Sequence, residues 1–118
     1  MADPRIKALK IKTGVVKRVA KEKVMYEKEA EEQRQRIQKY KDQGKDEHDI
    51  KKQEEVLQES LMMVPDCQRR LVKAYDELKL LLETESSLSG AEEYIAAQKV
   101  LDEAKNQLPA AGTLQHFC

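Results

Sequence analysis

The sequence predicts an all-α protein: an antiparallel three-helix bundle, an elongated rod with two long helices and one shorter third helix. This prediction depends on two apolar seams, one before and one after Gly44. Members of each seam recur at steps of three, four or seven residues or sums of these, so each seam lies on one face of a long helix that packs beside the other. The first seam is Leu9, Val16, Val19, Tyr26, Ala30, Ile37 and Tyr40, and the second is Ile50, Leu57, Leu61, Val64, Leu71, Tyr75, Leu78 and Leu82.

The composition favours a slender bundle over a core of large rings. The 118 residues form one domain, with a charged fraction of 37% and an aromatic fraction of 4%. The long helices are apolar over a wide arc only in residues 6–20 and 71–82, as a helix with two neighbours requires. We therefore expect the third helix to cover that half, and the other half to be a two-stranded coil.

The first helix is expected over residues 4–42. Asp3 can cap its free N–H groups, and Pro4 fits the first turn because its missing N–H costs nothing there. Gly44 can adopt the left-handed conformation that ends a helix.

Two residues that are disfavoured inside helices lie within the long helices. Pro65 lies in the second helix, expected over residues 47–85, and the seam continues in phase across it, which predicts a kink rather than a break. Gly14 lies in the first helix, and a close approach by the ring of Tyr75 would explain it.

The third helix is expected over residues 90–108. Ser89 and Glu92 have the spacing of a capping box at its start. Its apolar positions are Tyr94, Ala97, Leu101, Ala104 and Leu108. Residues 1–108 are therefore expected to form a three-helix bundle, and residues 109–118 a flexible C-terminal tail.

The net charge is zero, but the charges are unevenly distributed. Residues 1–41 contain thirteen Lys or Arg and six Asp or Glu, whereas residues 42–118 contain nine and sixteen. Two interpretations remain open. The basic first helix attracts acidic neighbours within the chain, or it presents a cationic face to an acidic partner.

The sequence has no signature of an enzyme: no Gly-rich phosphate loop, no nucleophile elbow and no paired metal-ligand spacing. We expect no catalytic residue, no metal site and no cofactor. No aromatic residue interleaves with the basic residues before Tyr26, so nucleic-acid binding is not expected. No apolar run approaches the roughly 20 residues of a membrane span, so no membrane partner is expected. Cys67 is expected as a buried thiol in a reduced, cytoplasmic protein.

Four apolar residues lie off the seams, at nearly the same level of the predicted hairpin: Val24, Met25, Met62 and Met63. One interpretation is that they pack beneath the third helix or the tail. The other is an adaptable contact patch for an unfolded or partly folded client. With cations of the first helix, this hypothetical client-binding surface consists of Lys17, Arg18, Lys21, Val24, Met25, Met62 and Met63.

Several runs of the sequence resemble one known family. They are residues 11–18, 21–30, 49–53, 57–70, 91–94 and 100–102. These runs resemble the family of tubulin-specific chaperone A, also called tubulin-folding cofactor A, and the resemblance covers about residues 1–105. The chain departs from the family pattern in its tail, from about Asn106.

The resemblance implies a function without chemistry. Members of the family are cytosolic three-helix rods that capture and stabilise β-tubulin folding intermediates on the way to the α/β-tubulin heterodimer, without a nucleotide. It implies β-tubulin as the partner and, indirectly, other tubulin-folding cofactors, for a monomeric protein of the cytoplasm associated with the cytoskeleton. The alternative is a coiled-coil structural adaptor that self-associates through its distal half, which is the half that the third helix does not cover.

Overall fold

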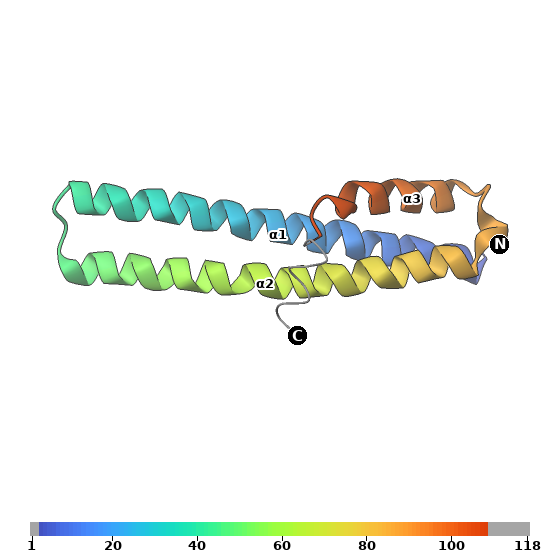
Figure 1. Ribbon diagram of the computed structural model, residues 1–118, viewed down its shortest axis with the longest axis horizontal. Coiled ribbons are helices and arrows are strands. Elements are labelled where there is room, and N and C mark those ends of the chain that lie inside the picture. Colours follow the sequence, from blue (N-terminus) through green and yellow to red (C-terminus); the bar gives the residue numbers. More distant parts are fainter. Residues whose placement is uncertain (1–2, 109–118) are drawn as a thin grey trace. The chain divides into compact units, whose positions relative to one another are not determined.

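The computed structural model describes residues 3–108, and in this range it contains three α-helices, one short 3-10 helix and no strand (Figure 1). The elements are α1 (Pro4–Asp42), α2 (Glu47–Thr84), the 3-10 helix η1 (Ser86–Leu88) and α3 (Glu92–Lys105). The prediction of an all-α fold with two long helices and a shorter third helix is therefore confirmed.

The helices contribute to two compact units, and each unit has its own buried residues. Unit 1 is formed by Met1–Ala20 together with Gln68–Cys118, and unit 2 by Lys21–Cys67. Unit 1 therefore contains the first part of α1, the last part of α2 and all of α3. Unit 2 contains the rest of α1 and α2 and the turn that joins them.

The first turn of α1 is capped as the sequence predicts. The carboxylate Oδ1 of Asp3 accepts a hydrogen bond from the backbone N–H of Arg5 at 2.9 Å. The guanidinium Nη2 of Arg5 donates to Oδ2 of the same carboxylate at 2.8 Å. The side-chain hydrogen bond from Arg5, followed by that from its backbone, holds the pKa of Asp3 below its ordinary value. Asp3 thus satisfies an N–H group that has no partner within the helix.

The turn after α1 is built on Gly44, which has a φ of 67°. The N–H of Gly44 donates to the carbonyl of Lys41 at 3.1 Å, and the N–H of Lys45 donates to the carbonyl of Tyr40 at 3.0 Å. These two bonds form the Schellman motif, which satisfies the last carbonyl groups of a helix through a left-handed residue. The predicted role of Gly44 is confirmed.

The helix α2 runs through Pro65 without interruption. The prediction that this proline does not break the helix is confirmed, and the kink stays a prediction. The helix ends at Thr84, one residue before the predicted end at residue 85.

The predicted capping box before α3 is wrong. The residue that precedes α3 is Ala91, and no side chain caps the helix. Ser89 instead follows η1, and its N–H donates to the carbonyl of Ser86 at 3.1 Å. The serine-rich turn winds into a 3-10 helix, which holds Ser89 away from the capping position, so α3 begins at Glu92 rather than at residue 90.

The end of α3 also differs from the prediction. The α-helix ends at Lys105 rather than at residue 108. Beyond it, the N–H of Gln107 donates to the carbonyl of Ala104 at 2.9 Å, and the N–H of Leu108 donates to the carbonyl of Lys105 at 3.2 Å. These tighter bonds continue the chain as turns, as is common at helix ends. The predicted tail, residues 109–118, lies outside the described residues.

The explanation proposed for Gly14 is also wrong. Gly14 is exposed, and a Cβ atom added there would meet no neighbouring atom within 4 Å. No ring therefore approaches this position, and Tyr75 does not require a glycine in α1.

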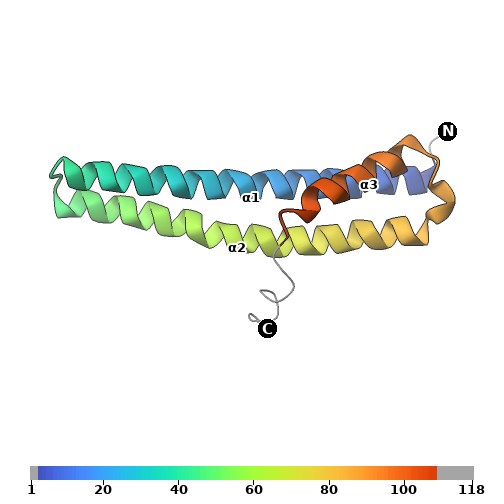
Figure 2. The same ribbon diagram turned by 45° about the horizontal axis from the view of Figure 1, so that its top comes forward.

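The core of unit 1 is built by three helices, and Figure 2 shows α3 beside the first part of α1 and the last part of α2. The phenol of Tyr94 on α3 donates to the backbone carbonyl of Leu82 on α2 at 2.8 Å. This bond satisfies the one polar group of a buried ring. The buried members of the core are Leu9, Val16, Val19, Ala20, Leu71, Ala74, Leu78, Leu82, Tyr94, Ala97, Val100, Leu101 and Ala104.

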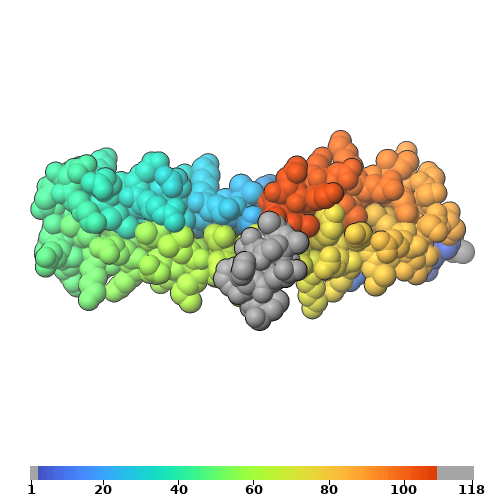
Figure 3. Space-filling view, in the orientation of Figure 1, coloured from blue at the N-terminus to red at the C-terminus, as the bar shows by residue number. Residues whose placement is uncertain are grey.

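Unit 2 has only two helical segments, which pack directly against each other (Figure 3). Its buried residues are Lys23, Ala30, Gln33, Ile37 and Cys67. The side-chain Nε2 of Gln33 lies 2.8 Å from Oε1 and 3.0 Å from the backbone carbonyl of Gln53. The narrow seam is therefore held by these three buried apolar side chains, by half-buried ones such as Leu57, Leu61 and Val64, and by an amide pair.

Replacing Gly14 and Gly44 by alanine should change the free energy of unfolding in opposite directions. Gly44→Ala places a Cβ in the left-handed region and should lower the free energy of unfolding by about 1–2 kcal/mol. Gly14→Ala fills open space on a helix surface and should raise it by about 0.5–1 kcal/mol. Urea unfolding followed by circular dichroism measures both, and a loss of stability in Gly14→Ala would contradict the open surroundings of this residue.

Asp3 should make the stability depend on pH in the acid range. Its pKa is lower in the folded protein than in the unfolded chain, so the unfolded chain binds the proton first as the pH falls. The contribution of the charged Asp3 is present above its ordinary value of 3.8 and is lost as the pH falls through the lower folded value. Asp3→Asn should therefore be less stable than the parent protein at pH 7, and urea unfolding at decreasing pH should show this difference closing. A difference that stays constant down to pH 2 would contradict this account.

Candidate functional site

An open groove of about 480 Å³ lies on the surface of unit 2. Its apolar lining comes from Tyr26 on α1 and from Val56, Met62 and Met63 on α2. Met62 is 69% exposed and Val56 is 44% exposed, so these side chains are not held in the core. The two helical segments of unit 2 thus leave an apolar surface that no third helix of the unit covers.

The predicted surface and the observed groove overlap only in part. Met62 and Met63 line the groove, whereas Val24 and Met25 do not. Val24 and Met25 are nevertheless 49% and 46% exposed, which is the exposure of a surface contact and not of a core position. The other interpretation, that these residues pack beneath the tail, concerns residues 109–118, which lie outside the described residues.

Sequence reasoning missed Val56 as a member of this surface. Val56 and Met63 are seven residues apart, so they share one face of α2, and both line the groove. Tyr26, a member of the predicted first seam, is half-buried and lines the groove. The seven-residue spacing between Val56 and Met63 is the signal that the sequence carries, but Val56 adjoins the seam residue Leu57 and so does not stand apart from the seam.

Carboxylates surround the apolar groove. Glu29 and Glu59 are among its lining residues. Residues 22–32 of α1 contain five Glu and two Lys, and residues 53–66 of α2 contain three Glu, one Asp and no Lys or Arg. The middle of the otherwise basic α1 is therefore acidic, and the groove lies in a negative electrostatic environment.

The cations of the predicted surface lie outside this groove. Lys17 and Arg18 belong to unit 1, Lys21 is the first residue of unit 2, and all three are exposed. Lys17 lines a separate open hollow of about 450 Å³ in unit 1, together with Glu92 and Glu93. The charge around Lys17 is thus mixed rather than purely cationic.

Part of the positive charge of α1 is neutralised within unit 1. Three ion pairs join α1 to acidic residues later in the chain, at distances of 3.0 to 4.0 Å. They are Lys12 with Glu77, Arg5 with Glu85 and Lys10 with Glu93. The hydrogen bond from Lys12 and then its charge lower the pKa of Glu77. For these three cations, attraction within the chain is the observed role.

Two kinds of site are not found among the described residues. Among the described side chains, no group of three or more His, Cys, Asp or Glu is placed to hold a metal ion. Within residues 3–108, no helix combines the length and the hydropathy that a membrane span needs. The side chain of Cys67 is fully buried, which confirms its predicted burial.

Comparison with known proteins identifies the family. The family model for tubulin binding cofactor A matches residues 4–101. Human tubulin-specific chaperone A is 59% identical over 105 residues, which cover 89% of this chain and 97% of that protein. Tubulin-folding cofactor A of Arabidopsis thaliana is 42% identical over 106 residues, which cover 88% and 94%.

A solved structure of similar fold supports the same assignment. It is that of human tubulin chaperone cofactor A, which is 56% identical and superposes with a TM-score of 0.76 over 86% of this chain and 99% of the other. The match of the family model spans nearly all of the three helices. The chain therefore belongs to the tubulin binding cofactor A family.

Proposed function

We propose that this chain is a tubulin-folding cofactor that captures and stabilises β-tubulin folding intermediates on the way to the α/β-tubulin heterodimer. The observation that carries the proposal is the family match over residues 4–101, which spans both units. Relatives that share 59% and 42% of the aligned residues are named as a tubulin-specific chaperone and a tubulin-folding cofactor. The exposed apolar surface of unit 2 supports the proposal, because a chaperone needs apolar contacts for a partly folded client.

The groove of unit 2 is the proposed binding site for apolar segments of the client. A partly folded protein exposes apolar side chains of varied shape, and the thioethers of Met62 and Met63 adapt to such shapes better than branched side chains do. Val24 and Met25 add exposed apolar area on α1. Glu29 and Glu59 favour client segments that carry Lys or Arg beside their apolar residues.

The exposed cations Lys17, Arg18 and Lys21 are the proposed contacts for acidic groups of the client. Such contacts act at a solvent-exposed surface, so they steer association more than they hold the complex. In this proposal, the chain acts as a monomer in the cytoplasm, without nucleotide, cofactor or catalysis, and passes its client to other tubulin-folding cofactors.

The proposal predicts selective capture of β-tubulin. Unfolded β-tubulin diluted from denaturant into a solution of the chain should form a soluble complex without nucleotide, and unfolded α-tubulin should not. Size-exclusion chromatography and native electrophoresis measure the complex. Equal retention of both tubulins, or of neither, would contradict the proposal.

A sedimentation experiment separates this function from that of a structural adaptor. The chaperone is expected to sediment as a monomer over a wide concentration range. A stable dimer without client would favour a coiled-coil adaptor that self-associates through its distal half.

The groove predicts which apolar substitutions weaken capture. Val56→Ala combined with Met62→Ala removes apolar area that a client would bury, and should weaken the complex at least tenfold. Fully burying one such side chain is worth about 1.5–3 kcal/mol, both side chains are already partly covered in the chain itself, and a factor of ten corresponds to about 1.4 kcal/mol. The melting temperature should stay unchanged, because both side chains are exposed.

A matched control lies on unit 1. Leu80 and Ile95 are 63% and 54% exposed, and Leu80→Ala combined with Ile95→Ala removes a comparable apolar area there. This control should capture β-tubulin normally. Unchanged capture by the groove variant, or equal weakening in the control, would show that the groove is not the client site.

A further inference from the structure

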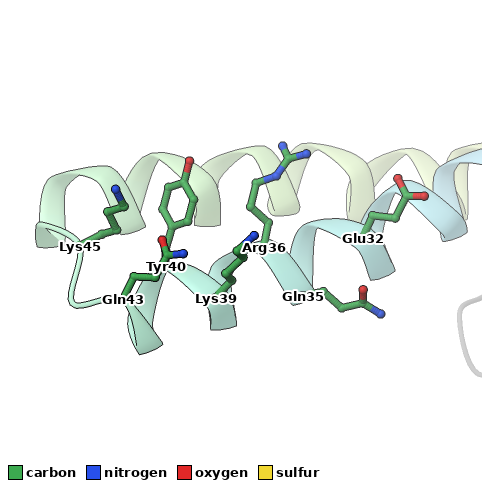
Figure 4. A pocket seen from close by; sticks show the side chains of 7 residues that line it. All are labelled: Glu32, Gln35, Arg36, Lys39, Tyr40, Gln43 and Lys45. Carbon is green, nitrogen blue, oxygen red and sulfur yellow. The ribbon is translucent and has the colours of Figure 1, made fainter.

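A second open hollow of unit 2, of about 430 Å³, lies where α1 ends (Figure 4). Three cations line it: Arg36, Lys39 and Lys45. Figure 4 shows the side chains of Arg36 and Tyr40 extending in the same direction from α1, with Lys45 at the turn and Glu32 at the opposite end of the hollow. The hollow therefore has a cationic part next to the turn.

The backbone holds these cations close together. Arg36 and Lys39 are three residues apart on α1, which places them on adjoining turns of one face. The Schellman motif fixes the backbone of the third cation, Lys45, because its N–H donates to the carbonyl of Tyr40 at 3.0 Å. The turn at Gly44 thus folds Lys45 back toward the last turn of α1.

The cations of this hollow form no ion pair with a carboxylate of the described residues. Among residues 3–108, no ion pair includes Lys39, Lys45 or Glu32. The guanidinium Nη1 of Arg36 donates to the neutral amide Oε1 of Gln33 at 3.4 Å. The lining of the hollow contains three cations and one carboxylate, Glu32, so its formal net charge is positive.

The acidic residues that follow the turn have a different role. Asp46, Glu47 and Asp49 lie before and within the first turn of α2, where the positive end of the helix stabilises negative charge. The carboxylate Oδ1 of Asp46 accepts the backbone N–H of His48 at 3.4 Å. None of these three residues lines the hollow.

We propose that this hollow binds a carboxylate-rich peptide segment of a partner protein. The three cations match carboxylates spaced along an extended chain, and the amides of Gln35 and Gln43 in the lining can bond its backbone groups. A nucleic acid fits the hollow less well, because Tyr40 is the one aromatic residue in the lining and offers a single ring for base stacking. Glu32 repels either kind of anion, so the three cations next to the turn are the expected contacts. The site is separate from the apolar groove and does not depend on the function proposed for that groove.

The test measures the binding of an oligoglutamate peptide to the whole chain. Fluorescence anisotropy of a fluorescein-labelled peptide at low ionic strength gives the dissociation constant. The variant Arg36→Gln, Lys39→Gln, Lys45→Gln should bind about tenfold more weakly, since three exposed ion pairs of modest strength are lost together.

The matched control removes the same charge from unit 1. It is Lys79→Gln, Lys99→Gln, Lys105→Gln; Lys105 lies in the last turn of α3 as Lys39 lies in the last turn of α1. This control should bind within about twofold of the parent protein. Circular dichroism checks that both variants are folded, and if the first is not, Lys45→Gln alone should bind about threefold more weakly.

Three results would overturn the proposal. The first is a parent protein that does not bind the peptide. The second is equal weakening in the control, which would show diffuse attraction by surface lysines. The third is tighter binding of a single-stranded oligonucleotide that the same hollow variant abolishes, which would assign the hollow to phosphates.

Discussion

The structure depends on the number of neighbours that each helical segment has. A helix buries the face that a neighbouring helix covers, so three packed segments bury wide apolar arcs and two bury a narrow seam. Unit 1 has three segments, and Leu9, Leu71 and Leu78 are fully buried in its core. Unit 2 has two, so apolar residues off its seam, such as Val56 and Met62, remain exposed. The apolar groove is a consequence of this missing third neighbour.

The features that could be predicted from the sequence are those that nearby residues decide. Asp3 and Gly44 set the two ends of α1, and each forms its hydrogen bond with a residue two or three positions away in the sequence. The start of α3 could not be predicted in the same way, because the residues around Ser89 fit two local structures and the 3-10 turn competes with the capping box. For Gly14, the prediction of a nearby ring is wrong because its surroundings are open, and no contact in the structure explains why a glycine stands there.

The candidate surface was harder to predict because the seam pattern gives the buried face but not the neighbours across it. Met62 and Met63 were found as apolar residues off the seam, but which residues border them depends on how α1 and α2 lie against each other. The structure brings Tyr26 of α1 to the same groove. It also shows that the net basic charge of the first helix does not describe its middle, where Glu29 borders the groove.

In unit 2, the side chains that stabilise the fold differ from those proposed to bind partners. Substitutions can therefore change binding without changing the free energy of unfolding. The unit is held by residues such as Ala30, Ile37 and Cys67 and by the amide pair of Gln33 and Gln53. The side chains that the binding tests remove, such as Val56 and Met62 in the groove and Lys45 in the cationic hollow, are exposed, so their loss removes few native contacts. The small core also implies that unit 2 opens locally at a lower free energy than unit 1 does, since fewer buried apolar contacts oppose its opening. A client that buries the groove therefore supplies apolar contacts to the unit that has fewest of its own, so binding should stabilise unit 2 more than it stabilises unit 1.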